Sequence, residues 1–188
     1  VSAFYVSPLG RAKDTASLTL KRMGRTATEC DWLHEFDAPI DRPDVTDRKM
    51  ITWDWLPQDW TCEPLFYDYE GWADHPVMAQ DQVRTQYNWV TDNFDRLLQA
   101  HGYVREDRHY RVEQSSRDTL VFFCHFGLEC VLLSHLLCIS PMVLWHQMCA
   151  APSSVTTLVT EERREGIALF RMTGFGDISH LYKYGEQP

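Results

Sequence analysis

Two short segments of this 188-residue chain end an apolar run with a residue that can handle phosphate. In the first, the strand-like residues 3–6 lead into the turn-like residues 7–10 and then Arg11, at the predicted start of a helix. A helix N-terminus offers unpaired N–H groups and positive potential, and a guanidinium beside it adds bidentate contacts to phosphoryl oxygens. Arg11 is therefore a candidate phosphate ligand, although an arginine in a first helical turn is more often a surface residue.

The second segment, residues 121–127, is a hydrophobic run that delivers His125 into a turn before a second apolar helix. Taken alone, such a histidine is more often a core residue with satisfied hydrogen bonds than a functional group. Folds of the α/β class bind ligands beyond the carboxyl ends of their strands, which is where both residues stand. We therefore expect Arg11 and His125 to converge on one anion-sized space.

The residues of these segments carry a family resemblance. Ser7-Pro8-Leu9-Gly10-Arg11-Ala12, followed by Asp14-Thr15-Ala16, resembles the Ser-Pro-Leu-x-Arg-Ala-x-x-Thr-Ala signature of the histidine phosphatase (phosphoglycerate-mutase-like) superfamily. Cys124-His125-Phe126-Gly127 is similar to that family's second histidine segment, commonly Ser-His-Gly-Gly, with Phe126 as a departure. Residues 175–181 are similar to its closing segment. The three matches follow the family's order and span nearly the whole chain.

The resemblance implies a phosphoglycerate-mutase-like fold and a two-step phosphoryl transfer through a phosphohistidine. Arg11 would bind the phosphoryl oxygens, and a protonated His125 would stabilise the developing charge. The general acid would be a carboxylate in the segment 32–35, for which we choose Glu35, with Glu70 as the alternative. The family's nucleophilic histidine belongs to an Arg-His-Gly motif on a preceding strand, so we expect it upstream of Val1.

None of the other histidines occupies a position that matches the family's nucleophile; these are His34, His75, His101, His109, His135, His146 and His180. The Glu-Arg-His-Tyr-Gly stretch typical of the cofactor-dependent mutases is also not found after Leu33. A phosphomonoester hydrolase is therefore the preferred prediction. The alternatives are a phosphoglycerate mutase-type phosphotransferase, and a non-catalytic phosphate-binding or interaction domain on the same fold.

The elements that must position these residues follow from periodicity. We expect strands at 3–6 and 119–123, helices over 12–23, 83–102, 128–137 and 141–149, and a hairpin formed by 155–160 and 167–172. Residues 101–117 are expected to be a polar connection. This alternation predicts one domain over residues 1–188, built as a three-layer α/β/α sandwich. Residues 36–76, rich in proline and tryptophan, are expected to be an ordered insertion that packs over the site and selects the substrate.

The composition limits the partners and the location. A formal net charge of -9 argues against a nucleic-acid surface, and the six cysteines, which show no zinc-ribbon spacing, indicate a reduced, cytoplasmic protein. The apolar stretch 119–145 is read as a buried strand and helices, not as a membrane span. We expect a phosphorylated small molecule as the substrate and no metal or other cofactor, while the oligomeric state stays open.

Overall fold

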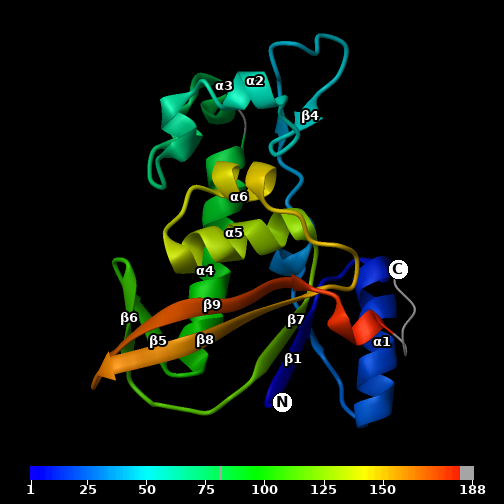
Figure 1. Ribbon diagram of the computed structural model, residues 1–188, viewed down its shortest axis with the longest axis vertical. Coiled ribbons are helices and arrows are strands. Elements are labelled where there is room, and N and C mark those ends of the chain that lie inside the picture. The colour runs from blue at the N-terminus through cyan, green and yellow to red at the C-terminus, as the bar shows by residue number, and fades with distance from the viewer. Residues whose placement is uncertain (81, 183–188) are drawn as a thin grey trace.

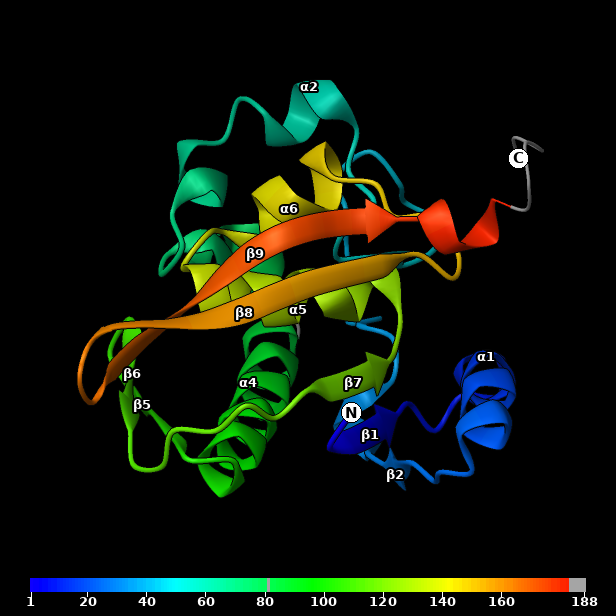
Figure 2. The ribbon, with the colours of Figure 1, turned by 60° about the horizontal axis from the view of Figure 1, so that its bottom comes forward.

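The computed structural model describes residues 1–80 and 82–182, and a small parallel sheet positions both phosphate-handling segments. Its strands are β1 (Ala3–Val6), β2 (Thr28–Glu29) and β7 (Leu120–Phe123), in the order β2-β1-β7; Figure 1 shows β1 beside β7, and Figure 2 shows all three. Strand β1 runs parallel to β7, with Val6 opposite Phe123. The two strands therefore end side by side, and the residues that follow them emerge at the same edge.

Helices pack against both faces of this sheet. On one face, α1 (Gly10–Met23) buries Ala12 and Ala16 against Val6, and it ends at Gly24, whose φ of +62° allows the left-handed C-cap. On the other face, Tyr5 and Phe122 join the main hydrophobic core, in which α4 (Val83–Ala100) and α5 (Phe126–Leu137) are packed. The predicted first strand and the helices that begin near residues 10, 83 and 128 are thus confirmed.

A second sheet is antiparallel and covers α5 from another side (Figure 2). Its order is β5-β6-β9-β8, made by β5 (Tyr103–Glu106), β6 (His109–Val112), β8 (Val155–Arg164) and β9 (Ile167–Asp177). The hairpin β8–β9 confirms its prediction and is longer than the sequence indicated. The polar connection expected over 101–117 is wrong for residues 103–112, because their hairpin is completed by pairing with β9, where Tyr110 lies opposite Ala168.

Between the two strand-helix units, residues 36–80 form short elements with a shared core. They follow the short helix η1 (Asp31–Leu33). In chain order they are β3 (Pro39–Ile40), β4 (Met50–Ile51), α2 (Pro57–Trp60), η2 (Pro64–Tyr67), η3 (Trp72–Asp74) and α3 (Pro76–Ala79). Their buried side chains, Phe36, Ile40, Trp55, Trp60, Phe66 and Trp72, belong to the same cluster as α4 and α5. Burying this much aromatic surface keeps the segment ordered without long secondary structure.

The stretch 119–145 is divided as predicted into β7, α5 and α6 (Pro141–Gln147), whose N-cap Ser140 accepts a hydrogen bond from the backbone N–H of Met142. A last short helix, η4 (Ser179–Leu181), follows β9. Across residues 1–80 and 82–182, no helix is long and apolar enough to cross a membrane. The mixed α/β class is confirmed, whereas a single three-layer sandwich stays a prediction because the strands form separate sheets.

Candidate functional site

Arg11, Ser7 and His125 form one hydrogen-bonded cluster where β1 and β7 end. Arg11 Nε donates to His125 Nδ1 at 3.0 Å, and the His125 Nε2 lies 2.7 Å from the Ser7 Oγ. The backbone N–H of Ser7 donates to the Phe123 carbonyl at 2.9 Å, which extends the strand pairing to the site itself. Arg11 and His125 thus lie in contact as expected, while the anion-sized space between them stays a prediction. Their chemical roles stay predictions.

These contacts define the tautomer of His125. A guanidinium has only donors, so Nδ1 must accept from Arg11 and the proton of a neutral imidazole is on Nε2. Nε2 therefore donates to the Ser7 Oγ, which also accepts from the Leu9 backbone N–H at 3.2 Å. An imidazole in this tautomer cannot take the Ser7 proton, so the Ser7–His125 contact does not constitute the nucleophile–base pair of a serine hydrolase.

The fold favours the neutral form of His125, whereas the protonated form expected during phosphoryl transfer stays a prediction. Burial lowers the pKa of His125 to about 4, and the positive charge of Arg11 contributes in the same direction. The side chain is buried, whereas Arg11 is exposed. An incoming anion would therefore meet Arg11 first. Its negative charge would raise the pKa of His125 and favour the protonated form only after binding.

The Glu35 carboxylate lies at the N-terminal turn of α5, the helix that begins directly after His125. Its Oε1 accepts from the backbone N–H groups of Phe36 at 2.9 Å and Leu128 at 3.0 Å. Burial raises the pKa of the Glu35 carboxyl, although both backbone hydrogen bonds and the Arg11 charge oppose the shift. A carboxyl group with a raised pKa can hold a proton closer to neutral pH, as a general acid requires.

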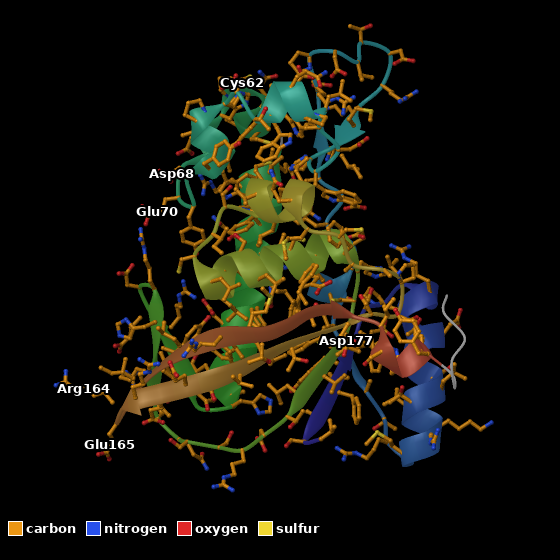
Figure 3. All side chains as sticks on the ribbon, in the orientation of Figure 1. Cys62, Asp68, Glu70, Arg164, Glu165 and Asp177 are labelled. Atoms are coloured by element: carbon orange, nitrogen blue, oxygen red, sulfur yellow. The ribbon has the colours of Figure 1, made fainter. Side chains whose placement is uncertain are left out.

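Glu70, the alternative acid, lies elsewhere. It is at the surface with its side chain 69% exposed, and its Oε1 is 2.5 Å from the Arg108 Nη2 (Figure 3). Arg108 comes from the turn between β5 and β6, in the antiparallel sheet, whereas Arg11 and His125 follow strands of the parallel sheet. Of the two candidates, only Glu35 contacts the segment that follows His125.

Trp53, in the segment between η1 and α4, packs against the start of α5. Its Nε1 donates to the Phe36 carbonyl at 2.6 Å, and its ring meets that of Phe126 edge to face at 6.2 Å. A Cβ added to Gly127 would lie 2.6 Å from the Trp53 Nε1 and 2.8 Å from the Glu35 Oε1. Glycine is therefore required at position 127 because two other segments approach its backbone closely.

No protein-family model matches this chain, and no curated protein matches it.

Three residues in or near the site were not singled out individually by the sequence. Ser7 was recognised only as part of a motif, and Trp53 only as one of many tryptophans in the segment 36–76. The third is Glu129, half-buried in the first turn of α5, where burial raises its pKa and Thr156 of β8 is a hydrogen-bond partner. The sequence could have indicated Glu129 as unusual, because it is the only formal charge in the apolar stretch 119–145.

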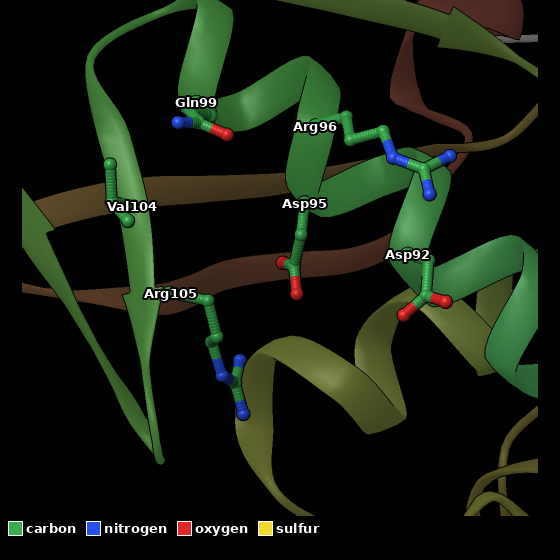
Figure 4. A pocket seen from close by; sticks show the side chains of 6 residues that line it. All are labelled: Asp92, Asp95, Arg96, Gln99, Val104 and Arg105. Atoms are coloured by element: carbon green, nitrogen blue, oxygen red, sulfur yellow. The ribbon is translucent and has the colours of Figure 1, made fainter.

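Two pockets lie away from the cluster of Arg11, Ser7 and His125. One, of about 260 Å³, is between α4 and β5 and is lined by Asp92, Asp95, Arg96, Gln99, Val104 and Arg105 (Figure 4). Its charged groups serve the structure: Asp95 binds His135 at 2.9 Å, and Arg105 donates to the His135 carbonyl at 2.8 Å near the end of α5. Within the described ranges 1–80 and 82–182, no group of His, Cys, Asp or Glu is placed to hold a metal ion.

Proposed function

We propose that the chain belongs to a phosphomonoester hydrolase of the histidine phosphatase type. The observation that carries this proposal is the contact between Arg11 and His125 at the paired ends of β1 and β7, where the helices α1 and α5 begin. Both helix N-termini direct positive potential toward the same place. An exposed guanidinium and a buried imidazole at that place suit a phosphoryl group in an otherwise acidic protein.

In this proposal, the Arg11 guanidinium turns its donors to two oxygens of the phosphoryl group. His125 becomes protonated as the anion binds and stabilises the negative charge that develops on the equatorial oxygens. A histidine nitrogen attacks the phosphorus while the ester P–O bond breaks, and Glu35 passes its proton to the departing alkoxide. Glu35 then takes a proton from the water that attacks phosphorus and releases the histidine, so that orthophosphate leaves.

The nucleophilic histidine of this scheme belongs to a strand upstream of Val1. Among the described strands, β7 pairs only with β1, so its second edge has no strand beside it. The four residues Leu120, Val121, Phe122 and Phe123 are each only partly buried, although their side chains are apolar. A parallel strand added at that edge would cover them, and its carboxyl end would lie next to His125.

The proposal also includes the three-layer fold and the class of substrate that the family resemblance implies. With a strand beside β7, the parallel sheet would have four strands with α1 on one face and α4 on the other, as in a three-layer sandwich. The substrate would be a phosphorylated small molecule in the cytoplasm. Hydrolysis is preferred over mutase-type transfer because the Glu-Arg-His-Tyr-Gly stretch typical of the cofactor-dependent mutases is not found after Leu33.

Inorganic phosphate tests the binding half of the proposal on this chain. Arg11→Gln removes the permanent charge, and Arg22→Gln is the matched control because Arg22 lies exposed in the last turn of the same helix. We expect phosphate to shift the His125 ring resonances in an NMR titration, and Arg11→Gln to weaken that binding at least tenfold. Arg22→Gln should leave it within twofold. Equal binding by wild type and Arg11→Gln would remove Arg11 from the site.

The second candidate is a non-catalytic phosphate-binding domain on the same fold. One other imidazole, that of His34, is near enough to contribute to the lowered pKa of His125, but its Nδ1 is hydrogen-bonded to the Glu35 carbonyl at 2.6 Å. The coding sequence upstream of Val1 distinguishes the two candidates. An apolar run that ends in Arg-His-Gly supports the hydrolase, whereas phosphate binding without that motif supports the non-catalytic domain.

A further inference from the structure

A groove with a basic rim lies at the far end of α5, in the second sheet and away from the Arg11–His125 cluster. It has a volume of about 470 Å³ and lies between the end of α5, the turn between β5 and β6, and the hairpin β8–β9. Its floor is apolar and is formed by Leu136, Leu137, Leu169 and Phe170. Four of the other lining residues are charged, Arg108, Glu161, Arg163 and Arg171, so the groove combines an apolar surface with groups that can bind an ion.

The rim has more positive than negative charge. Arg108, Arg163 and Arg171 line the groove, with side chains 59%, 77% and 54% exposed. Arg163 and Arg171 share the single carboxylate of Glu161, at 3.1 Å and 2.7 Å, and hydrogen bonding to Arg171 and Arg163 lowers the pKa of that carboxyl. Arg108 is paired with Glu70, so the donors left for a ligand are mainly those of Arg163 and Arg171, which have five N–H groups each and face one carboxylate between them.

The apolar part of the floor reaches the surface. Leu169 is 48% exposed, although it stands between Phe170 and Ala168, which face the core. Residues 169–177 of β9 lie beyond the pairing with β6, which involves only Ile167 and Ala168 of β9. A ligand with an aliphatic body could therefore cover Leu169 and the end of α5, while its charged end meets the arginines.

We propose that this groove binds a small amphipathic anion, an aliphatic chain of medium length that ends in a carboxylate. The carboxylate pairs with Arg163 and Arg171, in competition with Glu161, and the chain lies over Leu137 and Leu169. The positive rim is local, because the whole chain has a formal net charge of -9. Long-range attraction would not bring such an anion to the molecule, so the contacts inside the groove must supply the affinity.

Octanoate is the probe, and methyl NMR of Leu137 and Leu169 is the readout. We expect saturable binding in the millimolar range or tighter, since a ligand of this size gains modest affinity per atom. Butyrate, which is too short to cover the floor, and octanol, which lacks the charge, should each bind at least fivefold more weakly. The proposal would be overturned if neither octanoate nor a longer homologue showed saturable binding. Equal binding of octanoate and octanol would also overturn it.

Two variants test the rim in opposite directions. The pair Arg163→Gln and Arg171→Gln should weaken octanoate binding at least tenfold, whereas Glu161→Gln should strengthen it several-fold because it frees both guanidiniums. Arg164→Gln is the matched control, since Arg164 is exposed at the tip of the same hairpin and does not line the groove (Figure 3).

The proposal is independent of the phosphatase assignment, because Arg11→Gln should leave octanoate binding unchanged. Weakening by Arg164→Gln as large as that of the lining pair would show only a general charge effect and would overturn the site. So would binding of an acidic, leucine-containing peptide in the absence of octanoate binding, which would assign the groove to a protein partner.

Discussion

The hydrogen bonds that hold Glu35 oppose the chemical role proposed for it. Two backbone N–H groups hold its Oε1 and favour the ionised form, yet burial prevails and raises the pKa. The side chain is thus fixed in position by the start of α5 while its carboxyl group retains a proton more readily than an exposed glutamate. This combination suits proton delivery to a leaving alkoxide.

Glu35→Gln tests that delivery in a chain extended upstream to include the proposed Arg-His-Gly segment. Glutamine keeps an acceptor for the two N–H groups but cannot donate a proton to the alkoxide as an acid. We expect the rate on an alkyl phosphate to fall by roughly 10²–10⁴-fold, the range of general-acid catalysis, with a small change on an aryl phosphate whose leaving group needs little protonation. An unchanged rate on the alkyl ester would remove Glu35 from the mechanism.

His125 makes the stability of the protein depend on pH. Its pKa is about 4 in the folded protein, against an ordinary value of 6.5, so in that interval the unfolded chain binds a proton that the folded chain does not. The stabilising contribution is therefore complete above about pH 6.5 and is lost as the pH falls toward 4. Solvent screening at the edge of the site reduces the effect to about 1 kcal/mol.

Urea unfolding at pH 7.5 and pH 5 measures this contribution. We expect the free energy of unfolding to fall between the two values more in the wild type than in His125→Gln, by about 1 kcal/mol. Other titrating groups affect both proteins equally, so the comparison isolates His125. Parallel pH profiles would show that the imidazole is not kept neutral by the fold.

At the scale of elements, the start of α5 is the point where three segments meet. Gly127 provides the room, because Trp53 comes from the segment after β4 and Glu35 from the residues after η1, and both approach the same backbone. The Trp145 Nε1 of α6 also donates to the Gly127 carbonyl at 2.9 Å. The position of the candidate acid therefore depends on close packing around one glycine.

Gly127→Ala should destabilise the protein by about 1–3 kcal/mol, since the new methyl group must displace a tryptophan ring or the Glu35 carboxylate. Gly10→Ala is the control, because a Cβ at position 10 meets nothing within 4 Å, and alanine in the first turn of α1 should be neutral or stabilising by about 0.5 kcal/mol. Thermal unfolding of both variants gives the comparison. Equal stability of Gly127→Ala and wild type would mean that Trp53 does not pack as described.

At the scale of the whole molecule, two sheets share one core but are not hydrogen-bonded to each other in the part of the chain that the structure describes. The parallel sheet holds the candidate site, and the antiparallel sheet covers α5 (Figure 2). Residues of its hairpin β8–β9 also line the basic groove. The edge of β7 is where an additional strand would extend the parallel sheet.

Amide hydrogen exchange tests that additional strand. In a chain extended upstream of Val1, the backbone N–H groups of β7 that point away from β1 should exchange at least tenfold more slowly than in the present chain. The amides of α4 provide the control, because their hydrogen bonds lie within the helix and should change little. Unchanged exchange in β7 would show that the upstream segment does not pair there.

The sequence by itself determined the elements whose signals are local. Periodicity marked α1, α4 and α5, and apolar runs marked β1 and β7, because each of these patterns is contained within one element and its burial. The ends of α1 and α6 were predictable for the same reason, since Gly24 and Ser140 act on neighbouring backbone groups. The nearness of Arg11 and His125 also followed, because parallel strands end at a common edge.

Only the tertiary structure decided what depends on contacts between distant residues. The β5–β6 hairpin carries polar and charged side chains, and it gains its third strand from β9, more than fifty residues later in the chain. The choice between Glu35 and Glu70 rested on which of them reaches α5, and the neutral state of His125 on burial and on Arg11. Desolvation and long-range hydrogen bonds arise from packing, so no local pattern in the sequence contains them.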